Sequence, residues 1–140
     1  MGFKQRNIID MSVLGGFYAS VVYVLLTWSL GWNPLNFIGY TITTYASISI
    51  IRLLYHKPRP KPQKYDSFLT KIDSASFPSL HCARASIIAL HAQQYVSEYT
   101  MAILATTVVL VMYSRIMLKK HDVYDCVAGV VLAQLIVFLW

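Results

Sequence analysis

Long apolar runs separated by short polar segments divide the sequence. Residues 11–51 contain no Asp, Glu, Lys or Arg, and this run is long enough for two membrane-spanning helices of about 20 residues each. A turn between the two helices contains Asn33, which can cap the second helix, and Pro34, which suits its first position. The pattern therefore predicts spanning helices over residues 11–30 and 34–55.

A polar connection over residues 56–77 follows the second predicted helix. Its prolines, Pro58, Pro60 and Pro62, rule out a regular helix there. Beyond the connection, three more apolar segments predict helices over residues 80–96, 99–118 and 122–140. The sequence therefore predicts an all-α integral membrane bundle with about five transmembrane helices, which forms a single domain over residues 1–140.

The composition agrees with a membrane protein. The chain is 56% hydrophobic and only 13% charged, whereas soluble domains usually carry about 25% charged residues. The net charge is +6, but the basic residues are clustered and no nucleic-acid-binding motif is present. The predicted partners are therefore the bilayer and an anionic group at its surface, with no nucleic acid.

Threading five helices through a bilayer assigns each loop to one side. All 12 Lys and Arg residues then lie on one side: Lys4, Arg6, Arg52, Lys57, Arg59, Lys61, Lys64, Lys71, Arg84, Arg115, Lys119 and Lys120. The other side carries an aromatic belt and one acidic residue: Trp28, Trp32, Tyr95, Tyr99, Trp140 and Glu98. This agreement supports the predicted number of spans, because a wrong number would scatter the basic residues.

The stretch between the last two predicted helices carries the most distinctive chemistry. His121 and Asp125 are four residues apart and would share one face of a helix. A carboxylate there can hold one imidazole nitrogen and leave the other free to attack. Arg115 lies just before them, where a guanidinium could grip a phosphate through two hydrogen bonds. The alternative interpretation is a basic loop with one His and a chance ion pair.

Two more stretches fall on the same predicted side. Residues 52–60 hold an Arg, six residues and Arg-Pro, and residues 78–81 read Pro-Ser-Leu-His. Together with Ser-Arg, five residues, His, three residues and Asp over residues 114–125, they resemble the signature of the type 2 phosphatidic acid phosphatase superfamily. That signature has Lys at the first position of the first motif and Gly before the His of the second. The third motif matches in full.

The resemblance implies a role for each motif residue. It implies phosphate binding by Arg52, Arg59, Ser79, Leu80 and Arg115. It also implies that His121 is the nucleophile that forms a phosphohistidine and that Asp125 fixes its tautomer. His81 would protonate the leaving oxygen and then activate water. No metal and no cofactor is implied, because the cations neutralise the phosphate.

Two residues depart from the signature. Arg52 stands where the family has Lys, so the positive charge is kept with a planar group. Leu80 replaces Gly. Its backbone N–H can still donate at a helix N-terminus, but its side chain must point away from the phosphate. Arg84 and Lys57 are further candidates for contacts with the head group.

The resemblance implies a lipid phosphatase with an isoprenoid or polyprenyl diphosphate as substrate. Alternatives are phosphatidate or phosphatidylglycerophosphate, a vanadium haloperoxidase, and a non-catalytic membrane protein that binds anionic lipid. A zinc site is another alternative, with the possible ligands His81, Cys82, His121 and Cys126.

The charge bias predicts a multi-pass cell-membrane protein with a cytoplasmic site. The outer face stays open as the alternative. For His91, which is on the third predicted helix, we expect an interhelical hydrogen bond rather than a proton relay.

Overall fold

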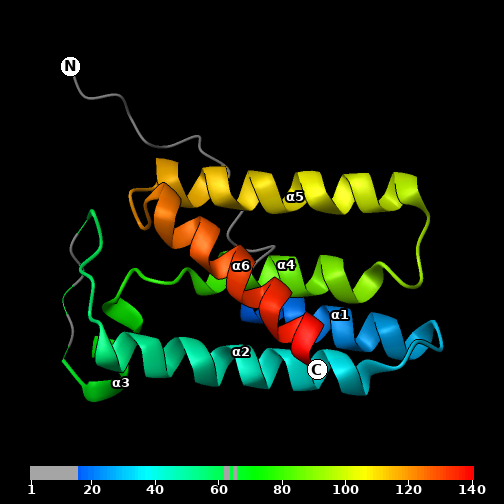
Figure 1. Cartoon of the computed structure of the whole chain (residues 1–140), viewed down its shortest axis with the longest axis horizontal. Helices are drawn as coiled ribbons and strands as arrows, with labels where there is room; N and C mark the ends of the chain where they lie inside the picture. The colour runs from blue at the N-terminus through cyan, green and yellow to red at the C-terminus, as the bar shows by residue number, and fades with distance from the viewer. Residues whose placement is uncertain (1–15, 62–63, 65) are drawn as a thin grey trace.

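The computed structural model describes residues 16–61, 64 and 66–140, and these residues form an all-helical bundle (Figure 1). Within them no strand occurs, although Pro58 and Ala75 form an isolated bridge. The helices are α1 (Phe17–Ser29), α2 (Pro34–Leu54), α3 (Phe68–Ser74), α4 (Leu80–Ala92), α5 (Glu98–Met117) and α6 (Val123–Leu139). The all-α prediction is confirmed for this part of the chain. Residues 11–15 of the first predicted helix lie outside the described residues, as do Lys4 and Arg6.

Two of the described helices, α2 and α5, are long and apolar enough to cross a membrane, with 21 and 20 residues. The apolar helices α1 and α6 are shorter, and α4 has 13 residues. A helix of that length spans about 20 Å at 1.5 Å per residue, less than the hydrocarbon core of about 30 Å. Two helices therefore meet the criteria of length and hydropathy for a transmembrane helix. The number of about five transmembrane helices stays a prediction.

Helix α3 lies inside the polar connection over residues 56–77, where the prolines were predicted to exclude a regular helix, so that prediction is wrong for this part. A capping box starts the helix: Ser67 Oγ accepts from the Thr70 N–H (3.2 Å), and Thr70 Oγ1 accepts from the Ser67 N–H (2.9 Å). Such reciprocal bonds satisfy two backbone donors that would otherwise be unpaired. The prolines precede α3 and do not interrupt it.

Helix α4 packs against α2, α5 and α6. Helix α6 crosses it closely at Gly129, where an added Cβ would collide with the carbonyl oxygen of Ser79. The Ser79 N–H also donates to the carbonyl of Asp125 at 2.9 Å. This close crossing, which only a residue without a side chain permits, places the start of α4 beside the start of α6.

His91 lies within α4 and is almost fully buried. Its Nε2 is 3.0 Å from the carbonyl oxygen of Asn33, and its Nδ1 is 2.9 Å from the hydroxyl of Tyr23. A carbonyl only accepts, so Nε2 carries the proton and Nδ1 accepts from Tyr23. The predicted interhelical hydrogen bond is confirmed, and His91 ties α4 to α1 and to the start of α2.

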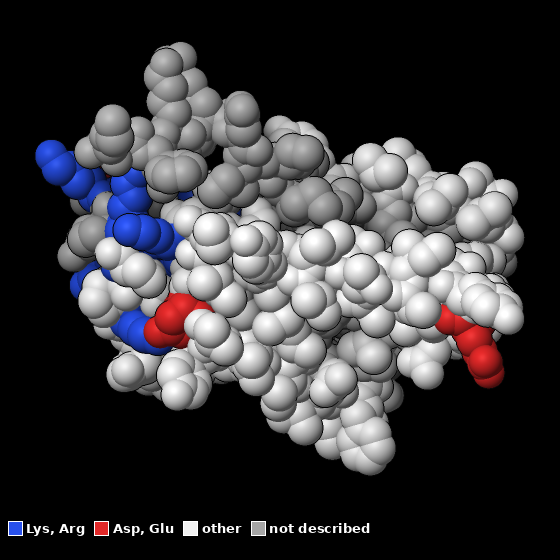
Figure 2. Space-filling model, turned by 90° about the horizontal axis from the view of Figure 1, so that it is seen from above, with Lys and Arg blue, Asp and Glu red and all other residues white. Residues whose placement is uncertain are grey.

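Basic residues are concentrated at one end of the bundle. Figure 2 shows the visible Lys and Arg side chains gathered at that end with an acidic group beside them, and another acidic side chain at the opposite end. In Figure 1 the segments after α2 and after α5 meet at one end, and the 30–33 and 93–97 turns lie at the other. The basic end is where the three motif stretches lie.

Candidate active site

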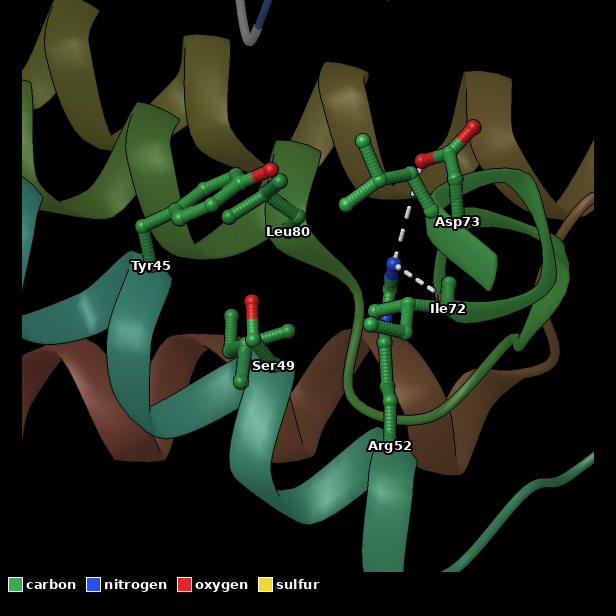
Figure 3. Close-up of a pocket in the computed structure, with 8 residues that line it drawn as sticks. Tyr45, Ser49, Arg52, Ile72, Asp73 and Leu80 are labelled. Carbon is green, nitrogen blue, oxygen red and sulfur yellow. Dashed lines mark hydrogen bonds and ion pairs between the residues drawn. The ribbon is translucent and has the colours of Figure 1, made fainter. Parts of the chain in front are cut away.

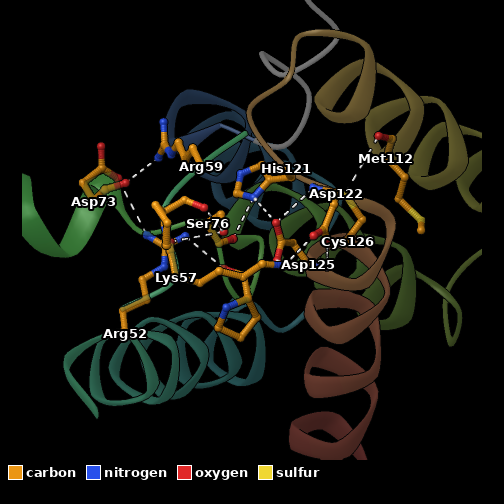
Figure 4. A network of polar contacts seen from close by, with 12 residues as sticks. Arg52, Lys57, Arg59, Asp73, Ser76, Met112, His121, Asp122, Asp125 and Cys126 are labelled. Carbon is orange, nitrogen blue, oxygen red and sulfur yellow. Dashed lines mark hydrogen bonds and ion pairs between the residues drawn. The ribbon is translucent and has the colours of Figure 1, made fainter. Parts of the chain in front are cut away.

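Backbone hydrogen bonds join the three motif stretches at the basic end. The Ser76 N–H donates to the carbonyl of Lys57 (2.8 Å), and the Ser79 N–H donates to the carbonyl of Asp125 (2.9 Å). The first bond joins the loop after α2 to the segment before α4, and the second joins that segment to α6. Residues about 20 to 70 positions apart in the chain thus form one polar cluster (Figure 4).

His121 lies in the loop between α5 and α6 and is 1% exposed. Its Nδ1 is 2.7 Å from the carbonyl oxygen of Ser76. Because a carbonyl can only accept, Nδ1 carries the proton and Nε2 has the lone pair. Nε2 is buried and has no hydrogen-bond partner among the residues that the structure describes. This nitrogen is therefore free to act as a nucleophile.

Asp125 lies near His121 without a direct hydrogen bond to it. The distance from Asp125 Oδ2 to His121 Nδ1 is 3.8 Å, which is beyond hydrogen-bond range. The Asp125 carboxylate instead accepts from the Asp122 N–H (3.0 Å) and from Lys57 Nζ (2.8 Å). The resemblance implied that Asp125 fixes the tautomer. In the structure the carbonyl of Ser76 holds the Nδ1 proton, and the Asp125 carboxylate lies 3.8 Å away.

The electrostatic environment keeps the imidazole of His121 neutral. Burial and then the positive charges of Arg115 and Arg59 lower its pKa to about 3, although the bond to the Ser76 carbonyl opposes the shift. A buried imidazole surrounded by cations resists protonation. Near pH 7 His121 therefore keeps the lone pair that an attack requires.

The three predicted phosphate-binding arginines are placed differently. Arg115 is 2% exposed in the last turn of α5. Arg52, in the last turn of α2, donates to the carbonyls of Pro78 (2.9 Å) and Ile72 (3.3 Å). Arg59 donates to the carbonyl oxygen of Asp73. Of the three, Arg115 has the largest electrostatic effect on His121. Arg52 and Arg59 both hold backbone carbonyls of α3, and Arg52 also holds the segment between α3 and α4 through Pro78.

Ser79 and Leu80 begin α4 as predicted. Ser79 is the N-cap, but its side chain makes no capping bond, and its buried Oγ has no partner in the described part of the chain. The side chain of Leu80 points towards α2, where with Arg52 it lines a cavity of about 270 Å³ (Figure 3). The cavity wall includes no residue from the 114–125 stretch. The Leu80 side chain therefore does not lie between the start of α4 and the 114–125 stretch.

The remaining predicted site residues are His81 and the two candidates for head-group contacts, Arg84 and Lys57. His81 is half-buried in the first turn of α4. Arg84, one turn further along, stacks its guanidinium over the ring of Tyr45 at 5.9 Å from the ring centroid, a cation–π contact. Lys57 is engaged by two carboxylates of the α6 start rather than directed outwards.

The described residues do not provide a set of ligands for the alternative zinc site. Over residues 16–61, 64 and 66–140, no three His, Cys, Asp or Glu side chains are grouped so that they could hold a metal ion. Cys82 and Cys126 are buried free thiols that contact each other between α4 and α6. They are packing residues in this structure.

Comparison with known proteins gives one match. The sequence model of the PAP2 superfamily matches residues 33–140, the superfamily whose signature the three motifs resemble. No curated protein and no solved structure is significantly similar to the chain. Members of this superfamily are phosphatases. Because the match covers more than half of the chain and includes all three motif stretches, this protein belongs to the PAP2 superfamily.

Proposed function

We propose that the protein is a membrane-embedded lipid phosphatase that works through a phosphohistidine at Nε2 of His121. The observation that carries the proposal is the state of this imidazole. Its Nδ1–H is held by the Ser76 carbonyl, and its buried Nε2 has no hydrogen-bond partner among the described residues. A held and neutral imidazole beside cations is suited to attack a phosphate ester.

The first chemical step forms a bond between Nε2 and phosphorus and breaks the bond from phosphorus to the leaving oxygen. His81 gives its proton to that oxygen. The guanidinium of Arg115, the hydroxyl of Ser79 and the N–H of Leu80 neutralise the charge on the phosphoryl oxygens. Arg52 and Arg59 add positive charge, and Arg52 also holds the carbonyl of Pro78, directly before Ser79.

The second step returns the enzyme to its starting state. His81, now unprotonated, takes a proton from water as the water oxygen attacks phosphorus. The bond from phosphorus to Nε2 breaks, its electron pair returns to His121, and inorganic phosphate leaves. Because the cations supply the electrostatic stabilisation, we propose that these steps need no metal.

A lipid substrate is supported by the place of the site at the end of two long apolar helices. Large apolar side chains on α2 and α5 are exposed, among them Leu54 at 84% and Ile103 at 66%. A head group at the polar end would leave its hydrocarbon chain alongside these surfaces. By family resemblance we propose an isoprenoid or polyprenyl diphosphate, with phosphatidate or phosphatidylglycerophosphate as alternatives.

The clustering of basic residues supports a site at the cytoplasmic face of the cell membrane, with the outer face as the alternative. A membrane-impermeant thiol reagent applied to intact cells tests this placement with the Lys64→Cys variant. Labelling of that variant would contradict the cytoplasmic face.

Phosphate release by the purified full chain in detergent tests the proposed function. We expect release from polyprenyl diphosphate that persists in excess EDTA. We also expect kcat/KM to be at least about tenfold higher than for a water-soluble phosphomonoester, because two buried methylene groups already contribute about 1.6 kcal/mol. Loss of release in EDTA would contradict the metal-independent mechanism. Binding of lipid phosphates without any release would favour the non-catalytic alternative.

A further inference from the structure

We propose that Lys57 is a positioning residue that holds the nucleophile His121 through two separate chains of contacts. The proposal rests on the proposed function, in which His121 attacks phosphorus. It differs from a head-group contact, which is the role that the sequence suggested for Lys57. One chain of contacts runs through its ammonium group and the other through its backbone carbonyl (Figure 4).

The ammonium group bridges the two carboxylates that start α6. Lys57 Nζ is 2.5 Å from Asp122 Oδ2 and 2.8 Å from Asp125 Oδ1. The two acids also form a capping box, in which each carboxylate accepts the backbone N–H of the other at 2.9 and 3.0 Å. The residues directly after His121 are therefore fixed to the loop that follows α2.

The backbone of Lys57 holds the acceptor that orients the imidazole. Its carbonyl accepts from the Ser76 N–H (2.8 Å) and from Ser76 Oγ (3.3 Å). The carbonyl of Ser76 in turn accepts the proton on Nδ1 of His121 (2.7 Å). The side chain and the backbone of one residue thus act on the same ring, one through α6 and one through the segment before α4.

Charge pairing explains why the ammonium group matters. The Asp125 side chain is fully buried, and a buried carboxylate without a cation is strongly unfavourable. Burial favours loss of the Lys57 proton, but the bonds to the two acids dominate and raise its pKa. Without this cation, the Asp125 carboxylate can approach His121 Nδ1, 3.8 Å away, and compete with the Ser76 carbonyl for its proton.

The two roles for Lys57 predict different kinetics. A residue that contacts the head group in the ground state raises KM when it is removed. A residue that holds the nucleophile lowers kcat, because a misplacement of about 1 Å can cost about 100-fold. The Lys57 ammonium already contacts two carboxylates and is 27% exposed, which supports the second role.

The test compares Lys57→Met, Lys57→Arg and the control Lys71→Met in the full chain, with polyprenyl diphosphate as substrate. We expect Lys57→Met to lower kcat about 10- to 100-fold with KM within about twofold of wild type. Lys57→Arg keeps the positive charge and should recover most of kcat, and Lys71→Met, which removes an exposed charge on α3, should resemble wild type. An increase in KM alone, or equal effects of Lys57→Met and Lys71→Met, would overturn the proposal.

A second readout does not depend on turnover. The chain has 4 His residues, so selective ¹⁵N labelling of histidine gives a side-chain spectrum in which His121 is assigned by its loss in His121→Ala. In wild type we expect the Nδ1–H tautomer with its proton held by the Ser76 carbonyl. In Lys57→Met we expect a shifted Nδ1 resonance, because the Asp125 carboxylate then competes for the same proton. An unchanged His121 signal in folded Lys57→Met overturns this inference. A wild-type protein that releases no phosphate would instead refute the proposed function.

Discussion

Replacing His121 with Ala is expected to reduce phosphate release at least about 1,000-fold, because the residue supplies the attacking nitrogen. In the part of the chain that the structure describes, its buried Nε2 has no hydrogen-bond partner, and its Nδ1–H donates to the Ser76 carbonyl. The loss should appear in kcat for polyprenyl diphosphate, measured as released phosphate. The protein should remain folded, because the substitution leaves the capping box of α6 intact.

His56→Ala is the matched control for this variant. His56 also lies at the basic end, but its side chain is exposed and contacts Ser74 at 3.2 Å. We expect the turnover of the His56→Ala variant to stay close to that of the wild-type protein. If His121→Ala retained turnover within about tenfold of wild type, the nucleophile would have to be another group.

Replacing Arg115 with Met is expected to lower kcat about 100- to 1,000-fold, which is typical for loss of one charged donor at a developing negative charge. Arg115 is buried in the last turn of α5, and its carbonyl accepts the N–H of His121 (3.3 Å). Met keeps the apolar stem and removes the guanidinium. Arg115→Lys should be intermediate, because a point charge lacks the planar fork of Arg.

The same substitution should also change the pH dependence. The charge of Arg115 contributes to the lowered pKa of His121, so its removal should raise that pKa. A raised pKa leaves more of the imidazole protonated on the acid side, and the acid limb of kcat/KM should move to higher pH. A variant with wild-type kcat and an unmoved acid limb would contradict the place of Arg115 at the site.

Local sequence signals predicted most helices well. Asn33 accepts from the Leu35 N–H at 3.0 Å and Pro34 begins α2, as the turn pattern indicated. The predictions were wrong where neighbouring sequence signals favoured different structures. Helix α4 ends at Ala92 rather than at residue 96, because the chain turns there before Ser97 caps α5. Helix α3 was not predicted because prolines precede it and because its capping box has Thr70 where the usual sequence signature has Glu or Gln.

The sequence predicted the parts of the site that the side chains of the three motifs form, but not the contacts made by the backbone or by residues outside the motifs. The three motifs predicted that His121, Arg115 and the start of α4 come together, and the structure places their segments side by side. The role of Ser76 depends on a backbone carbonyl, which any residue type can provide. Lys57 resembles the other basic residues of its loop, and its acidic partners lie 65 and 68 positions further along the chain. Ion pairs between residues so far apart in the chain can be identified only once the fold is known.

The covalent intermediate tests the central claim most directly. Wild-type protein would be mixed with polyprenyl diphosphate carrying a radioactive β-phosphorus and quenched in alkaline detergent within milliseconds. The account predicts a label on the peptide that contains His121, stable in alkali, labile in acid and absent from His121→Ala. A label on another residue, or phosphate release without any labelled protein, would contradict it.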